Sequence, residues 1–367
     1  MNPGPSARLV RLDGLRGIAV LCVLFFHVGP FLIPNLDPNM LPGGFLGVDL
    51  FFVLSGFLMT DILLGRKQGY GRFYVRRLAR VFPALYVFLA VQIIYWWAIG
   101  GGFLRSIGPY ALIGSGLSNW GSAFGVTLPF SLGQTWSLGV EEQLYLLWPL
   151  VLVLIGTRDP RRLKRLCLVG IAGSMLIKLV MLHAGVPTPD IYAQTEGRLD
   201  DFLVGALVAA VWNSDSRPVA HLRPLTALAA GFLVFSLAVA HPFTSRWLYE
   251  GGFTCVAISA GVLLYACLHQ TTGTGLAASR PLRAAGRYSY SIYLWHPLVF
   301  LAVYRSLPHA TAARVAVATA LLVAISVVST RAIEEPLRRL AARIPAPRTR
   351  LQKPRPVLIA AISGSGR

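Results

Sequence analysis

The chain has 367 residues, of which 55% are hydrophobic and only 13% are charged, and its mean hydropathy is +0.60. Because an ordinary soluble domain is about 25% charged, this composition argues against a soluble protein and predicts an integral membrane protein. The net charge of +19 would suit nucleic acid, but the basic residues stand in short tracts between apolar runs, so we expect no nucleic-acid partner.

The apolar runs predict an all-α polytopic membrane protein with ten transmembrane helices. Each run approaches the roughly 20 residues that cross a bilayer, although the sixth and seventh runs are short. The ten predicted spans lie near residues 15–33, 45–64, 81–100, 136–156, 166–183, 199–212, 225–240, 252–269, 288–305 and 312–332.

The basic residues set the predicted orientation. With the N-terminus inside, the inner segments hold 28 of the 34 Lys and Arg residues, as the positive-inside rule requires. We therefore expect both termini in the cytoplasm and a multi-pass protein of the cell membrane. Residues 1–340 would form the membrane domain, and residues 341–367, rich in Pro and Arg, would form a disordered cytoplasmic tail.

The first predicted span carries Arg16 and His27. At about 100° per residue their spacing brings both side chains to one helix face, roughly 16 Å apart along the axis. Asp13 lies one turn before Arg16. An ionisable residue within a membrane usually faces a polar cavity, and a histidine there suits general base catalysis. The alternative is a histidine that one neighbouring helix satisfies.

The second span contains Asp49 and Ser55. Ser55 lacks the G-x-S-x-G elbow of a hydrolase nucleophile, so we favour helix packing through Ser55 and Gly56. The Gly-rich stretch 101–135 is too apolar for disorder, and we expect it to form a re-entrant or lid-like segment.

Three arginines, Arg76, Arg77 and Arg80, make the loop before the third span densely cationic. Arg76 and Arg80 would share a face if this segment is helical. Guanidinium groups match phosphate oxygens, which favours a phosphate clamp. The alternative is a topology signal that also contacts anionic lipid head groups.

Charged pairs open two later spans. Glu141 and Glu142 precede Tyr145 at the start of the fourth span, and Arg198 and Asp200 open the sixth. Carboxylates at a span entrance need Arg, His or water as partners. For Glu141 and Glu142, a structural ion pair is the alternative to a functional role.

The ninth span contains His296 directly before Pro297. A proline within a helix frees a backbone carbonyl, which is tolerated in a membrane where protein or a cavity covers it.

The four cysteines show no zinc-binding spacing, so we expect neither a metal site nor a permanently bound cofactor.

Together these segments resemble the acyltransferase 3 family of bacterial membrane O-acyltransferases over residues 8–340. The most specific match is the Arg-x10-His pattern at Arg16 and His27. The other matching strings follow in the family's order, namely FLGVDLFFVLSGFL, FYVRRLARVFPALY, TWSLGVEEQLYLLWP, GRLDDFLVGAL and YSYSIYLWHP.

The resemblance implies about ten spans and an acyl-CoA donor, with acetyl-CoA as the default, used from the cytoplasm. It implies transfer to a hydroxyl of a sugar in an envelope glycan or glycolipid. It also implies that His27 is the catalytic base, that Arg16 acts with it in catalysis, and that Arg76, Arg77 and Arg80 handle the donor.

Further expectations complete this prediction. Glu142 would orient or charge-balance His27, and membrane lipid would surround the protein. Some members of the family add an extracytoplasmic esterase-like domain, but this chain ends soon after its last predicted span, so we expect none here.

Other functions stay open at this point. An acyltransferase for a glycosylated natural product such as a macrolide would use the same residues. A glycolipid transporter or flippase would also place charges and prolines in the membrane, although the sequence shows no inverted repeat. A purely structural membrane subunit would not require this polar set.

Overall fold

The computed structural model describes residues 5–33, 41–65, 70–100, 107–155, 159–214, 220–270, 274–308 and 311–344. Within these ranges every regular element is a helix and none is a strand, which confirms the predicted all-α fold. Most of the predicted tail, residues 345–367, lies outside the described residues, and residues 341–344 close the last helix.

The long helices supply the body of the protein. They are α1 (Pro5–Leu32), α2 (Gly47–Leu64), α3 (Tyr70–Ala98), α6 (Thr135–Ile155), α7 (Pro160–His183), α9 (Leu199–Ser214), α10 (Leu222–Val239), α11 (Phe253–Leu268), α13 (Ser289–Ser306) and α14 (Thr311–Val328).

Short elements connect them. The α-helical ones are α4 (Ile107–Gly114), α5 (Phe130–Gly133), α8 (Thr188–Ala193), α12 (Arg280–Arg287) and α15 (Glu335–Ala342). The 3₁₀ turns are η1 (Pro42–Leu46), η3 (Ser118–Trp120), η4 (Ser122–Phe124), η5 (Glu196–Arg198) and η7 (Thr274–Ala278), and the π-helical turns are η6 (Leu248–Gly252) and η8 (Ser329–Glu334).

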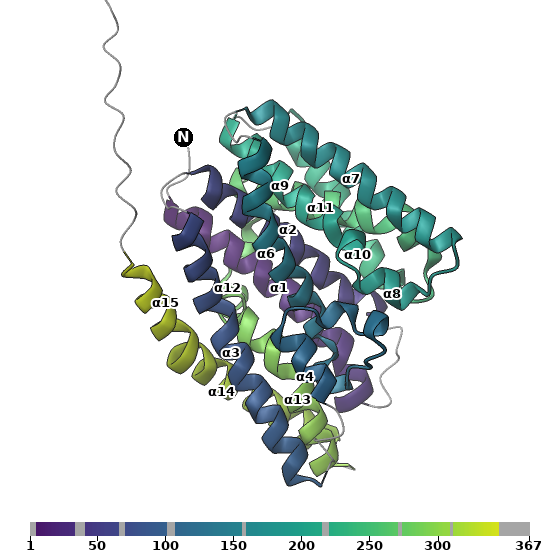
Figure 1. Cartoon of the computed structure of the whole chain (residues 1–367), viewed down its shortest axis with the longest axis vertical. Helices are drawn as coiled ribbons and strands as arrows, with labels where there is room; N and C mark the ends of the chain where they lie inside the picture. Colours follow the sequence, from purple (N-terminus) through teal and green to yellow (C-terminus); the bar gives the residue numbers. More distant parts are fainter. Residues whose placement is uncertain are drawn as a thin grey trace, which may run out of the picture.

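Figure 1 shows α1, α2 and α6 in the middle of the molecule, with α7, α9, α10 and α11 on one side and α3, α13, α14 and α15 on the other. Eight helical stretches in the described ranges are long and apolar enough to cross a membrane. A multi-pass membrane protein is therefore what the fold shows.

The exact number of ten spans stays a prediction. All ten predicted runs coincide with helices, but α9 and α13 fall outside the eight stretches. The 16 residues of α9 reach only about 24 Å, less than the roughly 30 Å of a bilayer core. The short run 225–240 does lie in one of the eight, Leu222–Val239.

Two predicted boundaries change. The third helix begins at Tyr70 rather than near residue 81, so the arginines expected in a loop lie on the first turns of α3. The stretch expected to form a lid contains α4, η3, η4 and α5 within residues 107–135, while residues 101–106 lie outside the described residues.

Glycines bring the central helices into backbone contact. A Cβ atom added at Gly56 of α2 would lie 1.9 Å from the carbonyl oxygen of Phe202 in α9, and one at Gly17 of α1 would lie 2.0 Å from that of Leu282 in α12. Small residues allow such close packing in membrane proteins. The predicted packing role of Gly56 is confirmed, and these contacts hold α2 against α9 and α1 against α12.

Candidate active site

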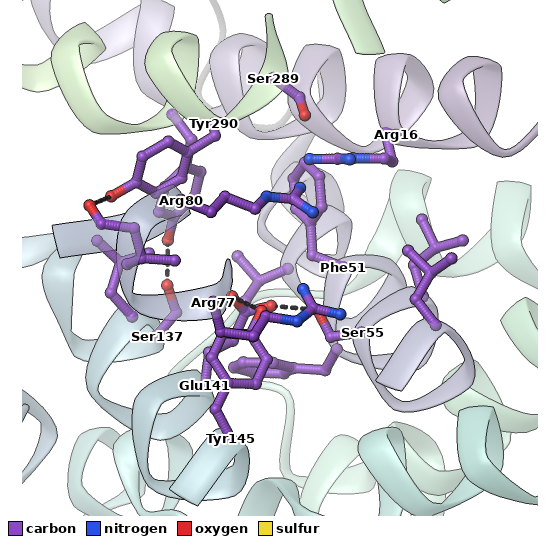
Figure 2. A pocket seen from close by; sticks show the side chains of 17 residues that line it. Arg16, Phe51, Ser55, Arg77, Arg80, Ser137, Glu141, Tyr145, Ser289 and Tyr290 are labelled. Carbon is purple, nitrogen blue, oxygen red and sulfur yellow. Dashed lines mark hydrogen bonds between the residues drawn. The ribbon is translucent and has the colours of Figure 1, made fainter. Parts of the chain in front are cut away.

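Five helices that are far apart in sequence surround one narrow cavity, which we call the arginine cavity. Its polar lining comes from Arg16 on α1, Ser55 on α2, Arg77 and Arg80 on α3, Ser137, Glu141 and Tyr145 on α6, and Ser289, Tyr290 and Tyr293 on α13. Its volume is about 70 Å³. Figure 2 shows the guanidinium groups of Arg16 and Arg80 pointing toward one another across it.

The charges that line the arginine cavity do not balance. Three arginines face one carboxylate, Glu141, and in the described part of the chain no ion pair within 4 Å ties these guanidinium groups to it. The guanidinium of Arg77 instead lies 5.0 Å from the centre of the Tyr145 ring, a cation–π contact. A cavity with excess positive charge and unshared donors is suited to an anionic ligand.

Glu141 is held in place by two neighbours. Ser55 donates a hydrogen bond to its Oε1 atom, and the Tyr145 hydroxyl donates to its Oε2 atom at 2.9 Å. Ser55 therefore lines the cavity as the partner of a carboxylate. That Ser55 is not a hydrolase-type nucleophile stays a prediction.

A second, wider cavity of about 600 Å³ lies beside the first, and we call it the histidine cavity. His27 and several aromatic rings line it, together with Asn119, Gln134 and the segment between η4 and α5. The predicted lid segment is thus a structured wall of this cavity.

His27 lines the histidine cavity and packs against His296, with ring centres 4.9 Å apart in an edge-to-face arrangement. The Nδ1 atom of His27 lies 2.8 Å from the carbonyl oxygen of Val23. A carbonyl only accepts hydrogen bonds, so Nδ1 carries the hydrogen and Nε2 keeps its lone pair. His27 is therefore in the tautomer that a general base at Nε2 requires.

His296 is fully buried and owes its orientation to Pro297. Because Pro297 has no N–H group, the carbonyl of Tyr293 lacks its usual helical donor. The Nδ1 atom of His296 donates to that carbonyl at 2.8 Å instead. The carbonyl that the sequence predicted to be freed is thus satisfied by the neighbouring histidine, and this bond fixes the ring beside His27.

The two cavities adjoin. Two side chains, Val48 on α2 and Tyr293 on α13, line both of them. The Tyr293 hydroxyl is fixed by a 2.6 Å hydrogen bond with Ser137 and donates to the carbonyl oxygen of Gln134 at 3.1 Å. Arg16 and His27 thus lie on one helix, as predicted, with Arg16 in one cavity and His27 in the next.

The structure separates the three arginines that the sequence grouped. Because this segment is helical, Arg76 and Arg80 share a face as expected, but the arginine cavity is lined by Arg77 and Arg80 and not by Arg76. On a helix, residues 77 and 80 are also one turn apart, and the packing of α3 turns that face inward. Asp13 lies on α1 where its backbone contacts Gly286, outside the lining of both cavities.

The expected contact between Glu142 and His27 is wrong. Glu142 lines a different cavity with Tyr74, Arg77 and Gly116, and its two buried oxygens have no hydrogen-bond partner among the described residues. Adjacent residues on a helix point about 100° apart. When α6 turns Glu141 toward Ser55, it turns Glu142 toward Gly116.

Three further predicted residues belong to a separate group, the ion cluster, formed by Asp49, Lys178, Arg198, Asp200 and Asp201. Arg198 Nη1 lies 2.9 Å from Asp49 Oδ1 and 3.5 Å from Asp201 Oδ2, and Lys178 Nζ lies 2.5 Å from Asp200 Oδ2. All five side chains are buried. This geometry favours a structural role for the ion cluster.

Aromatic rings enclose the ion cluster on one side. The guanidinium carbon of Arg198 lies 4.2 Å from the centre of the Tyr192 ring and 4.0 Å from that of Phe253. Tyr192 also lines the histidine cavity. The ion cluster therefore supports a wall of that cavity without opening into it.

Sequence reasoning missed several residues of these sites. Tyr290 was not among the predicted site residues, yet it lines the arginine cavity and donates to the carbonyl oxygen of Val81 at 2.7 Å. The i, i+3 spacing of Tyr290 and Tyr293 was the available signal, because it places both on one face. Lys178 gave no such signal, since its partner Asp200 comes from another helix.

Comparison with known proteins agrees with the resemblance. The acyltransferase 3 model, described as an acyltransferase domain, matches residues 9–331. YrhL of Bacillus subtilis (strain 168), provisionally named a peptidoglycan O-acetyltransferase, is 33% identical over 319 residues, which cover 79% of this chain and 48% of YrhL.

Other relatives match over a similar length. The peptidoglycan O-acetyltransferase OatA of Listeria monocytogenes is 33% identical over 318 residues, 79% of this chain and 49% of OatA. The O-acetyltransferase OatA of Staphylococcus aureus (strain NCTC 8325) is 27% identical over 305 residues, 78% and 49% of the two chains. The chain thus spans about half the length of these curated relatives. No solved structure matches it significantly. The extent of the family match shows that the chain belongs to the acyltransferase 3 family.

Proposed function

We propose that this protein is a membrane O-acetyltransferase that moves an acetyl group from acetyl-CoA to a sugar hydroxyl of a cell-wall glycan. The observation that carries the proposal is the arrangement on α1, where His27 has a free Nε2 atom in the histidine cavity and Arg16 lies in the adjoining arginine cavity. The named activities of YrhL and the OatA proteins support the choice of acceptor.

The proposed reaction needs one base and one anion site. A thioester is already activated, so the enzyme must mainly deprotonate the acceptor hydroxyl and stabilise the oxyanion. The Nε2 atom of His27 takes the hydroxyl proton as the acceptor oxygen bonds to the acetyl carbon. The carbon–sulfur bond then breaks, and the proton returns to the CoA thiolate. The arginine cavity supplies the cations that CoA phosphates require.

The proposed orientation places the arginine cavity toward the cytoplasm, where CoA is available. The charge distribution supports this topology, with both termini on the cytoplasmic side of the cell membrane. Single cysteines introduced at Gly69 and Thr188 into a cysteine-free background test it with a membrane-impermeant thiol reagent. Labelling at Thr188 from outside and at Gly69 only after permeabilisation is expected, and the reverse pattern would overturn the topology.

The activity is tested with purified protein in liposomes, ¹⁴C-acetyl-CoA and separate acceptors, namely a peptidoglycan disaccharide fragment and a glycosylated macrolide. Label on the disaccharide is the expected result, and label on the macrolide alone would favour the natural-product acyltransferase. A folded protein that transfers no acetyl group but moves a fluorescent glycolipid between leaflets would be a flippase.

A further inference from the structure

The arginine and histidine cavities are separated by very few side chains. Among the described residues, only Val48 and Tyr293 line both cavities. A donor held by the arginines must therefore present its acyl group to His27 past these two residues. We propose that Val48 and Tyr293 form an acyl gate whose width selects unbranched acyl groups, an inference that rests on the proposed function.

The difference in size between the cavities places the selective step at the gate. The arginine cavity has a volume of about 70 Å³ and the histidine cavity one of about 600 Å³. The wide cavity has room for an acyl group of either shape once it has entered. Discrimination between acyl groups therefore arises where the narrow cavity ends, and there it depends on cross-section more than on length.

Tyr293 is a rigid side of the gate. Hydrogen bonds to Ser137 and Gln134 hold its hydroxyl, and the Phe51 ring packs against its ring edge to face with centres 6.1 Å apart. The side chain is only 7% exposed. A ring fixed at its hydroxyl end and packed on its face cannot move aside without losing these contacts.

Val48 is the other side, and its helix is equally fixed. A Cβ atom at the neighbouring Gly47 would lie 2.3 Å from the carbonyl oxygen of Ala19, so the start of α2 rests directly on α1. Val48 itself is 6% exposed. Valine also has a restricted χ1 angle, so its two methyl groups present a constant shape. Replacing it with alanine would widen the gate without moving the helices.

The proposed transfer places the acyl carbon at the gate. The carbonyl carbon leaves the CoA sulfur on the arginine side and bonds to the acceptor oxygen on the histidine side, while the hydroxyl proton passes to His27 and finally to the thiolate. A methyl branch beside that carbonyl carbon would meet Val48 or Tyr293. One methylene that does not fit a closed pocket changes the rate about 10–200-fold.

The test compares butyryl-CoA with isobutyryl-CoA, which have the same atoms and differ in branching. Purified wild type in liposomes should transfer butyryl at least about tenfold faster than isobutyryl, with acetyl transferred readily. Val48→Ala should raise the isobutyryl-to-butyryl rate ratio about tenfold or more. Tyr293→Phe should raise it less, because the ring stays while its hydroxyl bonds are lost. The ratio is measured within one preparation, so partial loss of folded protein cancels.

Val81→Ala is the matched control, because Val81 is also 6% exposed and lines the arginine cavity without reaching the histidine cavity. Its ratio should equal that of the wild type even if its overall rate falls. Equal transfer of both isomers by wild type, or an unchanged ratio in Val48→Ala, would overturn the gate while leaving acetyl transfer intact. Folded wild type that transfers no acyl group at all would overturn the proposed function and the gate together.

Discussion

Within the described residues, the ion cluster and the charged side chains of the arginine cavity are built in opposite ways. In the ion cluster, Arg198 and Lys178 each lie within 4 Å of a carboxylate, and Thr254 donates a further hydrogen bond to Asp200. In the arginine cavity, three guanidinium groups face one carboxylate, Glu141, which accepts hydrogen bonds from Ser55 and Tyr145.

The difference separates structural charge from charge that awaits a ligand. Moving a charge from water into the protein has an unfavourable desolvation free energy, and a partner of opposite charge within hydrogen-bond distance offsets it. In the ion cluster, the partners of the charged groups are side chains of the protein itself. The arginine cavity keeps donors unshared, which is the arrangement expected where an anionic substrate completes the site. Variants in the two groups should therefore fail in different ways, either in activity or in folding.

The largest effect on activity is expected from His27→Ala. Loss of a general base costs about 10²–10⁴-fold in rate, while folding should persist because the His27 ring bonds only to a carbonyl of its own helix. The wild-type rate should also fall as the pH drops, because a protonated imidazole accepts no proton. Acyl transfer by purified variants, with thermal melting as the folding check, measures both.

His183 provides the matched control for His27. Its Nδ1 atom also lies 2.8 Å from the carbonyl oxygen one turn earlier, but the residue is exposed at the end of α7 and lines neither cavity. His183→Ala should keep the wild-type rate. A folded His27→Ala protein that retains more than about a tenth of that rate would remove His27 from the mechanism.

The largest effect on stability is expected from Arg198→Ala. It would leave Asp49 and Asp201 buried beside no cation of their own, and breaking a buried pair from one side costs about 3–5 kcal/mol. The exposed pair of Arg246 and Glu250 has a contact of 2.7 Å, and Arg246→Ala should cost only about 0–1 kcal/mol. Melting temperatures in detergent compare the two variants, and an equal decrease would contradict a structural role for the ion cluster.

A smaller effect on donor binding is expected from Arg77→Ala. Hydrogen bonds to charged groups contribute about 1.5–3 kcal/mol, so the apparent KM for acetyl-CoA should rise roughly 10–100-fold. The value of kcat should change less, because a phosphate contact is similar in the ground and transition states. Arg76→Ala should raise KM less than Arg77→Ala, since Arg76 lies outside the arginine cavity. A collapse of kcat at constant KM would instead make Arg77 catalytic.

The sequence predicted what depends on local periodicity. Arg16 and His27 share one helix, so their spacing alone places them on one face, and the structure puts each in a cavity. The sequence alone could not show which of the adjacent residues Glu141 and Glu142 faces the site, because that depends on how α6 is rotated against α2. The same ambiguity affected Arg76 and Arg77 on α3.

Contacts between distant helices lay further beyond the sequence. Lys178 and Asp200 pair across α7 and α9, and His27 meets His296 across α1 and α13. Neither pairing can be predicted from the spacing of residues along the chain, because the two residues of each pair lie on different helices. The charge or polarity of each buried residue therefore predicted that it has a partner, but only the packing of the helices showed which residue that partner is.

The smallest effect is expected from Glu142→Gln, and it tests the choice between the two neighbouring carboxylates most sharply. Glutamine keeps the shape of Glu142, whose oxygens accept no hydrogen bond from the described residues, so the rate should change by less than about threefold. Glu141→Gln is the matched comparison. It weakens the acceptor of Ser55 and Tyr145 and removes the carboxylate that faces the three arginines, so its rate should fall about tenfold or more. Both variants are compared for acetyl transfer at saturating acetyl-CoA, with melting temperature as the folding check. A larger loss in Glu142→Gln than in Glu141→Gln would return Glu142 to the mechanism, and the arginine cavity would then extend to the side of α6 that faces Gly116.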